Sequence, residues 1–173
     1  MRSLNRFAFS AIITVSLFAA SAYSSCKKET DKCKNVTCQN RGTCSAGTCT
    51  CPTGYTGETC NQLALIGAWR GIDSCTFGST FDVTMTISRS ATDTNAMLIN
   101  NPSGFGTEHT ITGTLSADKK SIIYTNQIIN TATYTDTLDG TIALTNNTGL
   151  THVFTAREGQ IFVISCSGSY NKL

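Results

Sequence analysis

Two hydrophobic patterns divide the chain. An apolar run fills residues 7–20, whereas apolar and polar residues alternate in much of the chain after residue 63. Phe81, Val83, Met85 and Ile87, for example, are each separated by one polar residue. A period of two places the apolar side chains on one face, as in a half-buried β-strand, and no segment keeps a helical period. The pattern therefore predicts an all-β domain over residues 63–173.

Eight further segments predict strands of the same kind, separated by turns rich in Gly, Asn and Asp. They are residues 69–77, 96–100, 109–115, 121–129, 131–138, 141–146, 150–157 and 160–170. The Asp139-Gly140 pair is interpreted as one of the turns. So many short strands with short connections predict an antiparallel barrel or sandwich.

The first 25 residues have the layout of a secretory signal peptide. Arg2 and Arg6 precede the apolar run, which is shorter than the about 20 residues of a membrane span, and small residues follow it. These residues lead to Cys26 and resemble the lipobox of bacterial lipoproteins, although Tyr23 stands where the motif usually has Leu. The resemblance implies cleavage before Cys26 and acylation of its new amino terminus. Residues 26–32 then form a lipidated polar tether.

The lipoprotein resemblance also implies a location. Lys27 directly after the cysteine resembles the sorting pattern of Gram-negative lipoproteins of the outer membrane. We therefore expect an exported protein that is lipid-anchored in that membrane, on its periplasmic or its surface face.

The cysteine count supports this interpretation. There are 9 cysteines, and an odd number leaves one thiol unpaired in an oxidising compartment. If Cys26 is acylated, the remaining eight cysteines can all form disulfides. In the alternative, the chain has an ordinary signal peptide and Cys26 forms a disulfide with another cysteine. Cys75 and Cys166 lie on the apolar side of the first and last predicted strands, which predicts a disulfide between them. A closed barrel makes its terminal strands neighbours and so permits this bridge.

The other six cysteines lie between residues 33 and 60, in a segment with few large apolar side chains. Such a segment depends on disulfides, which contribute roughly 2–4 kcal/mol each. A zinc site is disfavoured because the segment has no histidine and no paired C-x2-C motif. The number of cysteines alone does not determine which of the six form disulfides with one another.

Residues 33–60 resemble an EGF-like domain over their whole length. Residues 49–60, CTCPTGYTGETC, match the family signature C-x-C-x-x-G-[YF]-x-G-x-x-C at every fixed position. The segment lacks the acidic and aromatic residues of the calcium-binding members, so no calcium site is expected. The resemblance implies the disulfides Cys33–Cys44, Cys38–Cys49 and Cys51–Cys60.

Gly67-Ala68-Trp69 at the start of the β-domain resembles the G-x-W opening of lipocalins and of short bacterial lipocalin-like domains. The resemblance implies an antiparallel β-barrel over residues 63–173. The fold class predicted for the chain is therefore mainly β, with a disulfide-rich EGF-like module followed by a lipocalin-like barrel. A barrel of this size is filled by its own side chains or holds one small ligand. The candidate ligand-lining residues are Trp69, Phe81, Met85 and Phe154.

Charge and motifs exclude several functions. Lys and Arg number 13, Asp and Glu number 11, and no basic cluster is visible, which argues against nucleic-acid binding. An acid–base site built from Asp73, Asp136, His109 and His152 has no supporting motif, and both histidines fall at predicted strand ends where water reaches them. We therefore expect no enzyme, no metal and no cofactor.

Two functions remain. The first is an anchored lipoprotein with a non-enzymatic binding, adhesion or structural role, in which the EGF-like unit is a stalk or adhesion module and the barrel contacts an unknown protein or glycan. The second is a carrier of a small apolar ligand inside the barrel.

Overall fold

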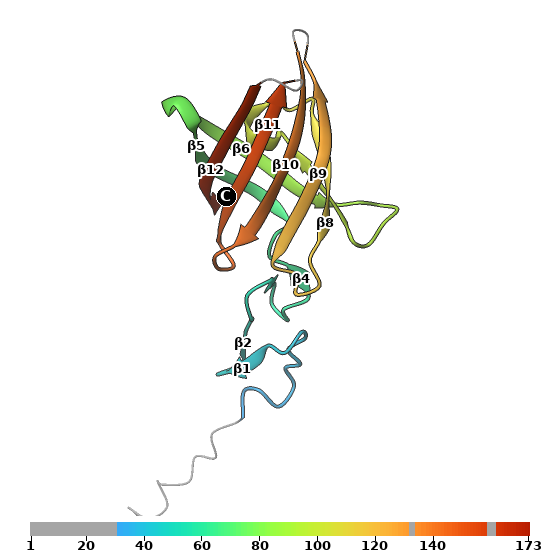
Figure 1. The fold of residues 1–173 in the computed structure, drawn as a ribbon. Coiled ribbons are helices and arrows are strands. Elements are labelled where there is room, and N and C mark those ends of the chain that lie inside the picture. Colours follow the sequence, from blue (N-terminus) through green and yellow to red (C-terminus); the bar gives the residue numbers. More distant parts are fainter. Residues whose placement is uncertain (1–30, 132–133, 159–161) are drawn as a thin grey trace, which may run out of the picture.

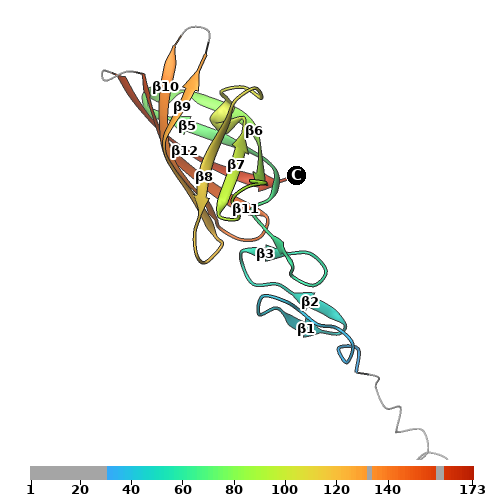
Figure 2. The same cartoon turned by 90° about the vertical axis from the view of Figure 1, so that its right-hand side faces the viewer.

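A computed structural model describes residues 31–131, 134–158 and 162–173, which form a small N-terminal module and a β-barrel arranged end to end (Figures 1 and 2). The signal peptide expected at residues 1–25 and the acylated Cys26 lie outside the described residues. Within the described ranges, no helix has the length and apolar character needed to cross a membrane.

The N-terminal module consists of two short hairpins. Strand β1 (Thr43–Ser45) pairs with β2 (Thr48–Thr50), and β3 (Tyr55–Thr56) pairs with β4 (Gln62–Leu63). The second hairpin carries the module to residue 63, beyond the expected boundary at residue 60. Three disulfides hold it together: Cys33–Cys44, Cys38–Cys49 and Cys51–Cys60, the pairs that the EGF resemblance implied.

The rest of the chain is a closed antiparallel barrel of eight strands, which confirms the predicted fold class. The strands are β5 (Gly67–Cys75), β6 (Thr80–Arg89), β7 (Ala96–Asn100), β8 (Thr110–Leu115), β9 (Ser121–Asn130), β10 (Thr135–Leu144), β11 (Gly149–Glu158) and β12 (Phe162–Lys172). Each strand pairs with the next, and β12 pairs with β5 to close the barrel. Cys75 and Cys166 lie directly opposite each other on this closing pair and form the fourth disulfide.

Side chains that point inward from alternate positions of each strand fill the barrel interior. On β6, Val83, Met85 and Ile87 are buried, whereas the residues between them are exposed. Inward side chains of the other strands complete one continuous core, which includes Trp69, Met97, Ile99, Ile122, Leu138, Ile142 and Tyr170. The period-two pattern thus gives each strand its buried face.

The prediction of a turn at Asp139-Gly140 is wrong, because strand β10 includes both residues. The reason is a close approach inside the barrel: a Cβ on Gly140 would lie 2.4 Å from the Tyr124 hydroxyl and 2.8 Å from Phe154 Cβ. Glycine within a strand often marks such an approach or a bulge. The pairing of β10 with β9 does shift register between Leu138 and Gly140.

The first barrel strand also ends earlier than predicted. It stops at Cys75, and Phe77 lies in the short 3-10 turn η1 (Thr76–Gly78) with a φ of 71° and 82% of its surface exposed. Phe77 therefore lies outside the barrel core, although the strand pattern placed it on the apolar side.

The segment between the two modules closes one end of the barrel. Leu63 and Leu65 are buried in the barrel core, and the Trp69 indole donates a hydrogen bond to the Leu65 carbonyl at 2.9 Å. The Lys172 ammonium donates to the Ala64 carbonyl at 2.7 Å. In addition, the Gly54 amide donates to Asn147 Oδ1 in the β10–β11 turn at 3.0 Å. The N-terminal module thus covers this end, and the opposite end lies away from it (Figure 1).

Candidate functional site

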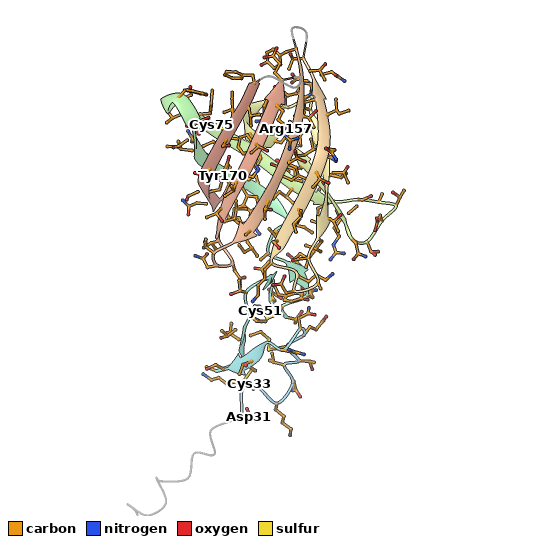
Figure 3. The ribbon with its side chains drawn as sticks, in the orientation of Figure 1. Asp31, Cys33, Cys51, Cys75, Arg157 and Tyr170 are labelled. Atoms are coloured by element: carbon orange, nitrogen blue, oxygen red, sulfur yellow. A yellow bond between two sulfur atoms is a disulfide. The ribbon has the colours of Figure 1, made fainter. Side chains whose placement is uncertain are left out.

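A cavity of about 270 Å³ lies at the end of the barrel remote from the N-terminal module, and we call it the open-end cavity. Figure 3 shows Cys75 in this half of the barrel, far from Cys33 and Cys51. The cavity lies among the short turn η2 (Pro102–Gly104) and strands β5, β6, β10, β11 and β12. Its lining residues are Cys75, Phe81, Ser103, Gly104, Phe105, Tyr134, Asp136, Phe154, Ala156, Glu158, Phe162, Ile164 and Cys166.

The strand register orders these residues by depth. On β11, Glu158 lies at the strand end, and Ala156 and Phe154 follow it inward along the same face. Ile164 on β12 pairs with Ala156, and Cys166 pairs with Phe154. The inner wall of the cavity is therefore apolar and includes the Cys75–Cys166 disulfide. Such a lining suits the apolar part of a small molecule.

The candidate ligand-lining residues separate into two groups. Phe81 and Phe154 line the open-end cavity, whereas Trp69 and Met85 do not. Trp69 and Met85 are fully buried near the end that Leu65 closes, so side chains of the chain itself fill that part of the interior. Phe81 is 50% exposed because it lies close to the start of β6, at the open end.

Two carboxylates line the outer part of the cavity. Asp136 near the start of β10 lies directly opposite Glu158 at the end of β11. Asp136 is only 7% exposed. Its side chain forms no hydrogen bond and no ion pair with any other described residue. Burial, followed by the negative charge of Glu158, raises the pKa of Asp136. We call these two residues the carboxylate pair.

A polar cluster lies beneath the inner wall. His152 is fully buried, which corrects the expectation of a water-accessible strand end, because β11 begins at Gly149 and the barrel encloses the ring. Its Nε2 lies 2.6 Å from the Tyr124 hydroxyl, its Nδ1 lies 3.5 Å from Ser103 Oγ, and its ring stacks on Phe154. Burial lowers the pKa of His152 to about 3. The ring is therefore neutral at physiological pH, with one nitrogen donating and the other accepting.

Asp73 lies on the same register row as His152, with Gly168 between them. A Cβ on Gly168 would lie 2.1 Å from Asp73 Oδ1, so the glycine leaves the space that the carboxyl group occupies. Neither oxygen of Asp73 nor the Tyr170 hydroxyl has a hydrogen-bond partner among the described residues. Burial raises the pKa of Asp73.

The four residues considered for acid–base chemistry do not form one site. Asp73 and His152 share the inner row, Asp136 lies in the outer part of the cavity, and His109 contacts Glu108 at 3.4 Å. Within residues 31–131, 134–158 and 162–173, no three His, Cys, Asp or Glu side chains come together as metal ligands.

Sequence reasoning missed the roles of two residues. Ser103, in η2 with a φ of 55°, both lines the cavity and contacts His152. Glu158 falls between the predicted strands 150–157 and 160–170, whereas in the structure it ends β11 and lies opposite Asp136. No local pattern marks either residue, because both roles depend on the register of strands that are distant in sequence.

Comparison with protein families identifies the N-terminal module. Residues 33–63 match the model of the Teneurin-like EGF domain. This range includes β4, in agreement with the observed hairpin. No curated protein matches the chain in sequence.

Solved structures similar to this chain have low sequence identity to it. A redesigned β-barrel is 14% identical with a TM-score of 0.43, and the match covers 64% of this chain and 92% of that one. A DUF3598-family protein of unknown function from Nostoc punctiforme is 14% identical with a TM-score of 0.41, covering 64% and 48% of the two chains. The S-type phycobiliprotein lyase CPES from Guillardia theta is 8% identical with a TM-score of 0.37, covering 64% and 89%. The chain thus combines a Teneurin-like EGF domain with an eight-stranded antiparallel barrel.

Proposed function

We propose that this protein is an exported, lipid-anchored binding protein without enzymatic activity, whose barrel takes up a small apolar molecule through its open end. In this proposal Cys26 carries the lipid at the outer membrane, and the EGF-like module is a spacer that holds the barrel away from the bilayer. The observation that carries the proposal is the open-end cavity, with its apolar inner wall, at the end remote from that module.

The unequal ends of the barrel support this function. At the covered end, Leu63, Leu65 and Trp69 fill the interior. At the open end, Phe81 and Phe162 are each about half exposed around the cavity. Exposed aromatic side chains that surround an apolar cavity are typical of ligand sites.

The proposed anchor and spacer place the cavity opening away from the membrane. Asp31, where the described residues begin, lies on the side of the EGF-like module that faces away from the barrel (Figure 3), and the proposed lipid is five residues earlier in the sequence. Three disulfides stiffen the intervening module. An anchor at Cys26 therefore leaves the open-end cavity on the far side of the protein from the membrane.

A cavity-filling variant tests the proposal. We expect an unacylated form of the exported chain, which begins at Lys27 and keeps both modules, to bind the neutral fluorophore N-phenyl-1-naphthylamine saturably, with one site per chain. Ala156→Leu adds bulk to the inner wall and is expected to weaken binding about tenfold, a loss of about 1.4 kcal/mol. The measurement is a fluorescence titration.

Thr155→Leu is the matched control, because residue 155 is the neighbour of Ala156 on β11 and points away from the cavity lining. Thermal unfolding of both variants checks that they fold. Absence of saturable binding by the parent chain, or an equal loss in the two folded variants, would contradict the proposal.

A further inference from the structure

We propose that the ligand of the open-end cavity carries a positive charge beside its apolar part, and that Asp136 and Glu158 bind this charge. The ligand class is a cationic amphiphile, such as a long-chain amine or a quaternary ammonium compound. This inference rests on the proposed function and specifies its ligand.

The first observation is the position of the carboxylate pair. Asp136 and Glu158 are direct neighbours across the β10–β11 ladder and both line the cavity. Directly opposed residues have Cβ atoms about 5 Å apart, and like charges at such positions destabilise the sheet. A cation held between the two carboxylates converts this repulsion into attraction.

The second observation is the burial of Asp136 without a partner. Asp136 is only 7% exposed, lines the cavity, and has no side-chain hydrogen bond or ion pair within the described ranges. Burial of an unpaired carboxylate is costly unless a donor or a cation compensates it. The free protein keeps this cost at the wall of a cavity, where a ligand has access.

The chain itself does not supply the missing positive charge in the part that the structure describes. None of the residues that line the cavity is Lys, Arg or His. Arg157 is the single Lys or Arg between residues 121 and 171, and it forms an ion pair with Asp139 instead. Because no described cationic side chain lines the cavity, a cation bound there comes from outside the barrel.

The depth of the carboxylate pair in the cavity and the aromatic residues around it indicate which kind of cation the cavity binds. The carboxylate pair lies near the opening, and Ala156, Phe154 and Ile164 lie further in, so an apolar tail points inward while a charged head remains at the entrance. Phe81, Tyr134 and Phe162 line the same cavity, and aromatic faces attract organic cations. A divalent metal ion is a poorer match, since Ca²⁺ takes at least six oxygen ligands and these walls are mostly apolar.

Competition experiments test the charge preference. Decylamine, decanol and decanoate share one alkyl chain and differ in head group, and each is titrated against N-phenyl-1-naphthylamine bound to the exported chain at neutral pH and low salt. We expect decylamine to bind about tenfold more tightly than decanol. Decanoate is expected to bind more weakly than decanol, and added salt is expected to reduce the advantage of the amine.

Two variants assign the effect to the carboxylate pair. Replacing both residues, Asp136→Asn with Glu158→Gln, keeps the shapes of the side chains and removes both charges, so decylamine should bind no better than decanol while decanol affinity stays unchanged. Glu58→Gln removes one negative charge from the EGF-like module and should leave the tenfold preference intact. Equal binding of amine and alcohol by the parent chain, or a preference that survives the double replacement of Asp136 and Glu158, overturns the inference. Failure of the fluorophore and of all three competitors to bind instead overturns the proposed function.

Discussion

Replacing Cys75 and Cys166 together by alanine is expected to lower the free energy of unfolding by about 4–5 kcal/mol. The two residues are separated by 91 positions in sequence, and the chain-entropy model assigns an effect of this size to the loss of so long a closed loop. The bridge joins β5 to β12, where the first and last strands close the barrel. Urea unfolding under non-reducing conditions measures the change.

The control for this variant is the neighbouring cross-strand pair. Ser74 and Ser167 face each other one position away on the same strands, and replacing both by alanine should change stability by less than about 0.5 kcal/mol. If the cysteine variant loses less than about 1 kcal/mol, strand pairing alone closes the barrel and the disulfide has no large stabilising role.

Acidification is expected to destabilise the barrel through His152. Burial lowers the pKa of this residue from 6.5 to about 3, so the folded state binds fewer protons than the unfolded state between these two values. The stabilisation from a neutral His152 is complete above the unfolded pKa and is lost as pH falls, by up to about 1.4 kcal/mol per pH unit. Chemical denaturation at a series of pH values from about 6.5 to 4.5 measures this slope.

Comparison with a variant that lacks this histidine isolates the effect. His152→Gln removes the titrating group, so its stability should depend less on pH in this range than that of the parent chain. Asp73 acts in the opposite direction: its raised pKa contributes stability that is present at low pH and lost as pH rises through the folded value. Asp73→Asn should therefore steepen the acid-induced loss. An unchanged slope in His152→Gln would contradict the assignment to His152.

Local patterns predicted those parts of the fold that depend on local chemistry. Cysteine and glycine spacing marks the EGF-like module, because a segment with so little apolar burial is defined by its disulfides and turns. Period-two alternation marks β6, whose inward residues Val83, Met85 and Ile87 are all buried. Strand parity also indicated that Cys75 and Cys166 face the same interior.

The cavity depends on information that no local pattern contains. Gly140 is typical of a turn in sequence, yet the Tyr124 ring from β9 occupies the space beside it and requires a glycine within β10. This error separated Asp136 from the strand that places it opposite Glu158. Likewise, Trp69 is a reasonable candidate for a ligand pocket until Leu65, which precedes the first predicted strand, closes that end of the barrel.

The most direct test of ligand uptake at the open end is chemical-shift mapping. Backbone amide spectra of the ¹⁵N-labelled exported chain are recorded during titration with decanol, a neutral ligand whose binding does not depend on the carboxylate pair. The account predicts saturable shifts concentrated at Ser103–Phe105, Phe154–Ala156 and Ile164–Cys166, with little change around Leu63–Trp69. Shifts centred on the covered end or on the outer surface of the barrel, or no saturable shifts, would contradict it.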